Sequence, residues 1–409
     1  MPLGAAGAAL ARRVATGTPA LSALWTFPAM LLSAFMVAWG AEAAEFLISQ
    51  GLALAALAWL QTLPEFAVEA VIAWEAGRDP GRMHLAIANL TGAIRLLVGV
   101  AWPMIYFVAA FAGRRERGRL PTIALDREHA VEVMGLLPPL LYFTFILAKG
   151  FISVVDAGVL ILLYVAYLGF LLRVPPHAEE QLADAPPISR WAYGLGGRRR
   201  VAAIAGLFLG GGLLLYLTAA PFLESMLGIA AALGVSDFVF VQWVAPFLSE
   251  FPEKVSAFAW ARRVDKAPMA LMNMVSSNIN QWTILAAMIP LVFGWSRAHA
   301  GGGWVAFHFD AAQQLEIALT LAQSLVAMLL LMEMRFDWWE AAGLFALWLV
   351  QFVRPATREV VAGLYLAWAA GLLVAGVLGR RPLLAPRLFL EVVRGGGGRR
   401  VAGKDSPRA

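Results

Sequence analysis

Long apolar runs alternate with short polar segments along almost the whole 409-residue chain. Eleven of the runs are about 18 residues or longer, the length that an α-helix needs to cross a bilayer. They cover approximately residues 21–44, 46–75, 84–112, 128–149, 152–174, 201–232, 236–262, 268–295, 311–333, 337–354 and 359–379. Because a helix satisfies its own backbone hydrogen bonds in lipid, the pattern predicts an all-α polytopic membrane protein.

The composition agrees with a membrane protein and excludes several other classes. Hydrophobic residues make up 60% of the chain and charged residues 14%, which is too apolar for a water-soluble protein of this length. The absence of cysteine excludes disulfides, thiol catalysis and cysteine–metal clusters. The five histidines form no HExxH motif, and no pattern of basic and aromatic residues suggests a nucleic-acid surface. We therefore expect neither an enzyme nor a nucleic-acid-binding protein.

Polar breaks and their charge predict the division of the chain and its orientation. The break at 175–200 is rich in Pro, Gly and charge, and the tail at 380–409 is basic and Gly-rich, with disorder expected from residue 390 onward. If the N-terminus is outside, most of the 32 Lys and Arg residues fall in cytoplasmic segments. This distribution predicts a protein of the plasma or inner membrane, with the N-terminus outside and the C-terminus cytoplasmic. The basic tail can also contact anionic lipid of the bilayer, but we favour its charge as a topology signal alone.

The chain contains an internal repeat. LQTLPEFAVEAVIAWEAGRD (60–79) and LSEFPEKVSAFAWARRVD (248–265) each place Pro-Glu inside an apolar span, and each is followed by an apolar helix that carries an Asn. Spans one to five (21–174) therefore match spans six to ten (201–355), and the eleventh (359–379) has no counterpart. Since five is an odd number, the second copy enters from the opposite side, which makes two inverted five-helix repeats with ten core helices.

The duplicated Pro-Glu pairs indicate a cation site. Proline inside a helix frees backbone carbonyls, and in lipid these are tolerated only where protein or a water-filled cavity receives them. Carbonyl and carboxylate oxygens are hard ligands, suited to Na⁺ or Ca²⁺. An isolated polar residue in a membrane helix more often holds helices together, but two Pro-Glu pairs at matched depth favour an ion site at Glu65 and Glu253.

Other polar residues share helix faces with these two carboxylates. Thr62 and Glu69 lie on the face of Glu65, since 62, 65 and 69 are spaced i, i+3 and i+7. The remaining candidates are Ser249 and Glu250 beside Glu253, Asn89 in the third span, and Asn273, Ser277 and Gln281 in the eighth.

These motifs resemble those of the sodium/calcium exchanger superfamily of cation/Ca²⁺ antiporters, whose two inverted repeats each carry GTSLPE followed by GNxxGSN. The matching stretches are LQTLPE (60–65) with ANLTGAI (88–94), and LSEFPE (248–253) with MNMVSSN (272–278). The resemblance covers about residues 21–355 and implies Na⁺- or H⁺-coupled cation antiport by alternating access. It implies Glu65 and Glu253 as central ligands, followed by Thr62, Ser249, Asn89, Asn273, Ser277 and Asn278.

Several residues depart from the family pattern. Glu250 replaces a small hydroxyl residue and adds a third carboxylate, and Gly92-Ala93-Ile94 stands where the family has Gly-Ser-Asn. Arg95 points off the presumed ligand face, so we favour a structural pair with an acid such as Glu69 or Glu45 over a fixed cation in the site. Lys254 follows Glu253 by one residue, and we expect it to turn about 100° away from the site.

The sequence thus predicts a secondary antiporter of the sodium/calcium exchanger type that binds Ca²⁺, Na⁺ or H⁺ at its paired Pro-Glu motifs. No cofactor is expected besides these transported cations. Na⁺/H⁺ or Ca²⁺/H⁺ exchange is an alternative, because a third buried carboxylate suits proton coupling. A second alternative is a non-transporting member whose site is neutralised by Arg95 and Lys254. The transported ions and the oligomeric state are left open by the sequence.

Overall fold

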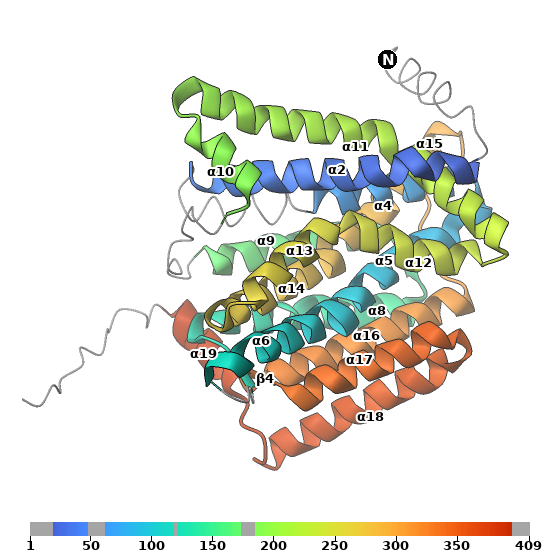
Figure 1. The fold of residues 1–409 in the computed structure, drawn as a ribbon. Helices are drawn as coiled ribbons and strands as arrows, with labels where there is room; N and C mark the ends of the chain where they lie inside the picture. The colour runs from blue at the N-terminus through green and yellow to red at the C-terminus, as the bar shows by residue number, and fades with distance from the viewer. Residues whose placement is uncertain (1–18, 48–61, 118–121, 173–184, 395–409) are drawn as a thin grey trace, which may run out of the picture.

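The computed structural model describes residues 19–47, 62–117, 122–172 and 185–394, and it is almost entirely helical there (Figure 1). Within these residues the first repeat contains α2 (Pro19–Glu45), α4 (Leu63–Arg78), α5 (Met83–Leu96), α6 (Trp102–Arg117), α7 (Ala130–Gly135), α8 (Leu137–Lys149) and α9 (Val154–Leu171). The second contains α11 (Gly197–Leu233), α12 (Asp237–Ser249), α13 (Phe251–Ala261), α14 (Ala267–Asn280), α15 (Ala286–His299), α16 (Ala311–Leu331) and α17 (Trp338–Val353). The eleventh span is α18 (Arg358–Val377). The predicted start of the second span, before Thr62, lies outside the described residues.

Regular structure extends beyond the predicted spans in two places. The 175–200 break contains a short helix, α10 (Pro187–Gly194), and α11 begins at Gly197, before the predicted residue 201. The expectation of disorder from residue 390 is wrong for its first residues, because α19 runs over Leu384–Val393. Both short helices have one apolar and one polar face, so their apolar side chains can pack on the bundle while the polar ones stay in water.

Equivalent elements follow in the same order in the two halves: the Pro-Glu motifs lie 188 residues apart, and the π-helical turns that follow them lie 184 residues apart. The α5–α6 span contains a π-helical turn, η2 (Leu97–Ala101), and the α14–α15 span contains its equivalent, η6 (Gln281–Leu285). Strand β1 (Thr122–Ala124) pairs antiparallel with β4 (Arg335–Asp337), and β2 (Phe151–Ile152) pairs with β3 (Phe307–His308). Each sheet therefore joins one strand of each repeat, as an inverted two-fold relation requires.

The match reaches individual backbone conformations. Gly150 ends α8 with φ +75°, and Met334 takes the equivalent left-handed conformation with φ +57°. The helices that follow begin with matching capping boxes, Ser153 with Asp156 and Asp337 with Glu340. The protein is therefore an all-α polytopic membrane protein built from two inverted five-helix repeats and one additional helix, as the sequence predicts.

Helices of opposite repeats pack in equivalent pairs. The first helices of the repeats, α2 and α11, lie side by side along one edge of the bundle, and α18 lies at the opposite edge (Figure 1). Between these edges α4 packs on α15, and α12 packs on α5. A Cβ at Gly92 of α5 would stand 1.8 Å from the backbone oxygen of Gln242 in α12, so this contact requires glycine.

Seven helical stretches among the described residues are long and apolar enough to cross a membrane. The stretches that contain α4, α12–α13 and α14–α15 are not among them. These three carry the Pro-Glu motifs and the polar residues that follow. Of these, the stretch of α12 and α13 is interrupted at Glu250, between Ser249 and Phe251.

The eleventh span is fixed to the second repeat by arginines at both of its ends. Arg358, its first residue, binds Glu316 of α16, and Arg381, beyond its last residue, binds Glu333 and Glu340. Burial lowers the pKa of Arg381, but its hydrogen bonds to these two carboxylates outweigh that effect and raise it. The helix thus supplies positive charges that the buried acids of the second repeat need.

Candidate cation-binding site

The centre of the molecule holds three carboxylates, at the points where two helices start. The α12 helix ends at Ser249, Glu250 lies between the helices, and α13 begins at Phe251 with Pro252 in its first turn. In the first repeat α4 begins at Leu63 with Pro64 in its first turn. Proline favours such helix starts because it lacks the N–H that would be unsatisfied there. The seventh span is therefore interrupted at Glu250, within the stretch PFLSEFPEK (246–254).

Glu65 and Glu250 come from different repeats and share one amide. Gln281, in the π-helical turn η6, lies with Nε2 2.9 Å from Oε1 of Glu65 and 3.0 Å from Oε1 of Glu250. All three side chains are buried, at 4% exposure or less. The oxygen of the same amide, Oε1 of Gln281, has no hydrogen-bond partner among the described residues. The repeats therefore converge on a buried group of oxygens with few donors.

Lys254 lies in this cluster and corrects one prediction. We expected its side chain to turn away from the site, but its Nζ donates to Oε2 of Glu250, one helical turn earlier. The side chain is only 9% exposed. The prediction considered only the angle between Lys254 and Glu253, whereas an i, i+4 spacing brings Lys254 over Glu250. Of the central carboxylates, Glu250 thus has a fixed positive partner.

Glu253 occupies the more open side of the cluster. Its Oε1 accepts a hydrogen bond of 2.6 Å from Ser277 and a long contact of 3.5 Å from Nδ2 of Asn273. Glu253 and Asn273 are half-buried, whereas Glu65 and Asn89, their first-repeat equivalents, are buried. The repeats are thus asymmetric, and in the described residues the second Pro-Glu carboxylate is the more accessible one.

The remaining predicted ligands lie near the cluster in different ways. Thr62 accepts a hydrogen bond of 3.0 Å from Asn280, a residue that the sequence analysis did not single out. Ser249 donates to the carbonyl oxygen of Ala245 at 3.0 Å, so its hydroxyl is turned toward its own helix. Asn278 is fully buried, and neither its oxygen nor its nitrogen has a partner among the described residues.

Asn89 meets a different carboxylate from the one expected. Its Nδ2 donates to Oε2 of Glu69 at 2.6 Å, one turn of α4 beyond Glu65. The family position one turn after Asn89 is Ala93, which offers no hydroxyl to Glu65. Asn89 of the first repeat thus pairs with Glu69, whereas its equivalent Asn273 contacts the Pro-Glu carboxylate Glu253.

No three His, Asp or Glu side chains of the described chain converge closely enough to hold one metal ion among them. Glu65 nevertheless lies close enough to Glu250, Glu253 and Lys254 for their charges to act on it. Three like charges in a buried region repel one another unless a cation or protons lie between them. The arrangement is suited to binding and releasing a cation rather than to holding one permanently.

Known proteins share the sequence pattern that builds this site. The family model for sodium/calcium exchanger proteins matches residues 18–173 and 203–354, which is most of each repeat. The chain belongs to the sodium/calcium exchanger family. Its general activity is therefore that of a membrane cation exchanger, and calcium transport is the activity associated with the family.

Two solved structures illustrate the range of similarity. The crystal structure of the H⁺/Ca²⁺ exchanger CAX is 29% identical, covers 94% of each chain and has a TM-score of 0.84. The sodium–calcium exchanger NCX_Mj, soaked with 10 mM Na⁺ and 10 mM Sr²⁺, is 19% identical over 82% of this chain and 98% of that chain, with a TM-score of 0.51. The latter shows the fold alone. No match is found among curated proteins.

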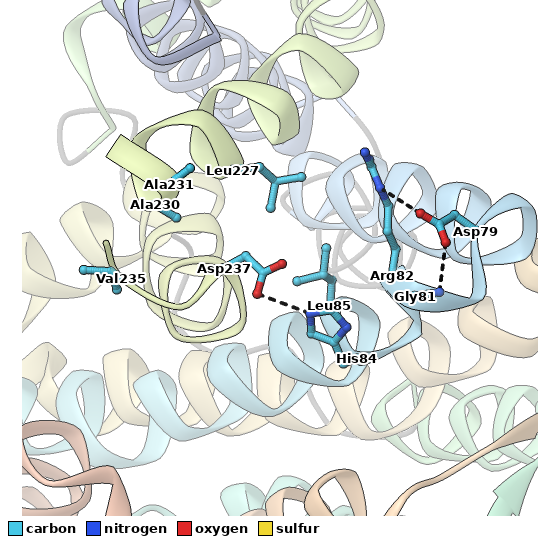
Figure 2. A pocket seen from close by; sticks show the side chains of 10 residues that line it. All are labelled: Asp79, Gly81, Arg82, His84, Leu85, Leu227, Ala230, Ala231, Val235 and Asp237. Carbon is cyan, nitrogen blue, oxygen red and sulfur yellow. Dashed lines mark hydrogen bonds and ion pairs between the residues drawn. The ribbon is translucent and has the colours of Figure 1, made fainter. Parts of the chain in front are cut away.

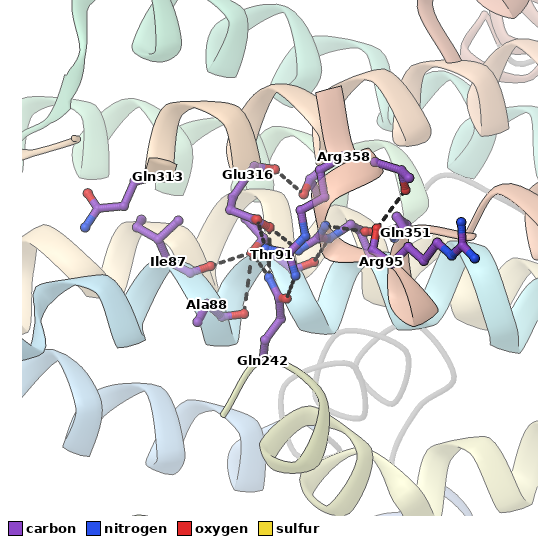
Figure 3. A network of polar contacts seen from close by, with 12 residues as sticks. Ile87, Ala88, Thr91, Arg95, Gln242, Gln313, Glu316, Gln351 and Arg358 are labelled. Carbon is purple, nitrogen blue, oxygen red and sulfur yellow. Dashed lines mark hydrogen bonds and ion pairs between the residues drawn. The ribbon is translucent and has the colours of Figure 1, made fainter. Parts of the chain in front are cut away.

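Arg95 of the exchanger lies outside the central cluster, in a second buried network (Figure 3). It is fully buried, binds Oε2 of Glu316 through Nη2, and donates to Oε1 of Gln351 at 2.7 Å. Arg358 binds the other oxygen of Glu316 and donates to Oε1 of Gln242 at 2.8 Å. The expected structural pairing of Arg95 is confirmed, but its partner is Glu316, not Glu69 or Glu45. A partner 221 residues away gives no local sequence signal.

The exchanger also has a polar pocket at the end of α4 (Figure 2). The pocket has a volume of about 470 Å³, and its polar side chains include Asp79, Arg82, His84 and Asp237. His84 lies 3.4 Å from Asp237, and Arg82 pairs with Glu224 at 2.8 Å. Two helices that begin beside this pocket, α5 and α12, run toward the central carboxylates.

Proposed function

We propose that this exchanger is a Ca²⁺/H⁺ antiporter in which Glu65, Glu250 and Glu253 bind Ca²⁺ or protons in turn. From the sequence alone, sodium/calcium exchange is the first expectation and proton coupling the alternative. The observation that carries the proton-coupled assignment is the ion pair between Lys254 and Glu250 within the carboxylate cluster. One fixed positive charge among three carboxylates leaves two net negative charges when all three are ionised.

Two net charges match one Ca²⁺ or two protons. Ca²⁺ prefers carboxylate and carbonyl oxygens, and the unpaired oxygen of Gln281 adds a neutral ligand beside Glu65. When Ca²⁺ leaves, the buried carboxylates must take up protons or another cation, because isolated charges in this position are costly. Ca²⁺ and protons then compete for the same oxygens, so occupancy by one excludes the other.

Further support comes from what the site lacks and from similarity. Ala93 and Ile94 remove a hydroxyl and an amide that the family motif has in the first repeat, which leaves fewer neutral oxygens for additional Na⁺ ions. The CAX structure, described as an H⁺/Ca²⁺ exchanger, resembles this chain over nearly its full length. We extend the proposal to the orientation, with the N-terminus outside and the C-terminus cytoplasmic, in the plasma or inner membrane.

A non-transporting role would require the central acids to be neutralised permanently. Arg95 binds Glu316 and does not reach them, and Lys254 binds Glu250 alone. Glu65 and Glu253 have no ion pair among the described residues, so we favour transport.

The test is Ca²⁺ uptake by vesicles that contain the purified full-length protein. One set of vesicles carries an outward proton gradient and no Na⁺, and the other carries an outward Na⁺ gradient at equal pH. We expect uptake in the proton arm, lost in Glu253→Gln and in Glu65→Gln but kept in the surface variant Glu224→Gln. Uptake in the Na⁺ arm alone would replace proton coupling by sodium coupling.

A further inference from the structure

The short helix α10 also has apolar side chains that do not pack on the bundle. Ile188, Trp191 and Leu195 are all exposed, Trp191 by 59%, and their i, i+3 and i+7 spacing places them on one side of the helix. A different side of α10 fixes it to α2, because the buried Ser189 donates to Oε2 of Glu42 at 3.0 Å. The helix is therefore held in place while it presents tryptophan and aliphatic side chains to its surroundings.

Four arginines lie in the same stretch of chain. They are Arg190 and Arg198–Arg200, and the segment 185–200 contains no acidic residue. None of the four forms an ion pair with a carboxylate of the described residues. Arg200 packs over the ring of Tyr193, with its guanidinium carbon 3.9 Å from the ring centroid, and the other three arginines are exposed. The surface therefore presents positive charge that no described residue compensates.

The arginines lie where α11 enters its apolar run. The helix begins at Gly197, and its sequence is apolar from Val201 onward. Arg198 lies 11 residues before Leu209, and 11 residues are about three full turns, so both side chains are on one face of α11. Leu209 is 74% exposed, and the exposed face of a membrane helix contacts lipid. Arg198 is thus on the lipid-facing side of α11, one turn before the apolar run, which is the level of the head groups.

These features fit an anionic phospholipid better than a protein partner. Tryptophan is enriched at the membrane interface, where its ring lies among the head groups, and basic residues attract the anionic lipids of the cytoplasmic leaflet. Arginine also matches the geometry of a phosphate with its paired N–H donors. A protein partner would have to bring carboxylates to the arginines, and a two-fold contact with a second copy would bring the same arginines together.

We propose that α10 and the start of α11 form a binding surface for anionic phospholipid at the cytoplasmic leaflet. Trp191 and its two aliphatic neighbours lie among the head groups and the upper acyl chains, and the exposed arginines bind the phosphates. The orientation proposed above decides the leaflet, whereas the identity of the exchanged ions plays no part. Since α10 packs on both α2 and α11, the first helices of the two repeats, bound lipid stabilises this pair (Figure 1).

The first experiment titrates phosphatidylglycerol or phosphatidylcholine into the delipidated full-length protein in detergent and counts bound lipids by native mass spectrometry. We expect the first phosphatidylglycerol to bind more tightly than phosphatidylcholine. Arg198→Gln/Arg199→Gln, at two exposed positions that should not disturb folding, should raise its Kd about tenfold. The matched control is Arg127→Gln/Arg387→Gln, which removes the same charge from two arginines that pair with Glu391. Equal losses in the two double variants, or no preference for phosphatidylglycerol in the wild type, would overturn the proposal.

The second experiment locates the lipid at α10. The chain contains no cysteine, so Leu195→Cys can carry a single fluorophore. In vesicles we expect spin-labelled phosphatidylglycerol to quench this fluorophore more strongly than spin-labelled phosphatidylcholine, and Arg198→Gln/Arg199→Gln should remove the difference. Equal quenching by the two lipids in the wild-type background would overturn the proposal. An oligomer in the mass spectra that dissociates in Arg198→Gln/Arg199→Gln would also overturn it, because a second copy would then cover the surface.

Discussion

Replacing Glu316 by Gln tests whether the network around Arg95 holds the eleventh helix to the exchanger core. Glu316 is 3% exposed and binds one arginine with each carboxylate oxygen, Arg95 from α5 and Arg358 from α18. Glutamine preserves the shape of the side chain but removes its charge. Two buried guanidinium groups then face each other without a counter-charge.

The structure sets the expected magnitude. Removing one partner of a buried ion pair costs about 3–5 kcal/mol, because the remaining charge is uncompensated. Glu316→Gln leaves two such charges and should lie at the upper end of this range or above it. Arg358→Gln leaves Arg95 and Glu316 as a neutral pair, so its cost should be closer to the loss of one hydrogen bond to a charged group, about 1.5–3 kcal/mol.

The assay is thermal unfolding of the purified full-length variants in one lipid or detergent. We expect Arg358→Gln to lower the apparent Tm and Glu316→Gln to lower it further. Glu224→Gln is the matched control, because Glu224 also pairs with an arginine but its side chain is 53% exposed, where a pair contributes at most about 1 kcal/mol. A Glu316→Gln variant as stable as this control, or more stable than Arg358→Gln, would refute the reasoning.

Three further predictions concern other contacts. Gly92→Ala should lower the yield of folded protein and cost about 3 kcal/mol or more of stability, since its Cβ would stand 1.8 Å from the backbone oxygen of Gln242. The control Gly158→Ala, whose Cβ would lie in open space, should be neutral or stabilising in the same Tm assay. Lys254→Gln removes the fixed cation of the central cluster, so the apparent Ca²⁺ affinity measured by uptake should rise. A gain of about 1.4 kcal/mol in binding free energy would raise it about tenfold, and a lower affinity would contradict the reasoning. Arg381→Gln should lower the Tm by more than Glu224→Gln in the same assay, because it removes a cationic partner from two buried carboxylates, Glu333 and Glu340; equal losses would contradict this.

The architecture was predictable because its signals are local or repeated. Hydrophobic length alone locates the membrane helices, and the two Pro-Glu stretches reveal the inverted repeat before any contact is known. The interruption at Glu250 follows from Pro252 and from the charge around it. These features depend on the chemistry of neighbouring residues, which the sequence displays directly.

The partners of individual charged residues were not predictable in the same way. Arg95 binds Glu316, which is far away in sequence and lies on a helix that carries no motif. The side chain of Lys254 follows its i+4 neighbour Glu250, although its angle to Glu253 suggested the opposite. Asn89 binds Glu69 because the interhelix contact, not the family motif, decides which carboxylate it meets. Such choices depend on how helices pack, and packing is not visible from spacing along one helix.

The most direct test of the central claim is the internal pH of Na⁺-free vesicles after Ca²⁺ is added outside. With the wild-type protein, Ca²⁺ entry should drive protons out and make the interior alkaline, and Glu253→Gln should abolish the change. Ca²⁺ entry without any change of internal pH, or an equal change with Glu253→Gln, would contradict proton-coupled exchange at these carboxylates.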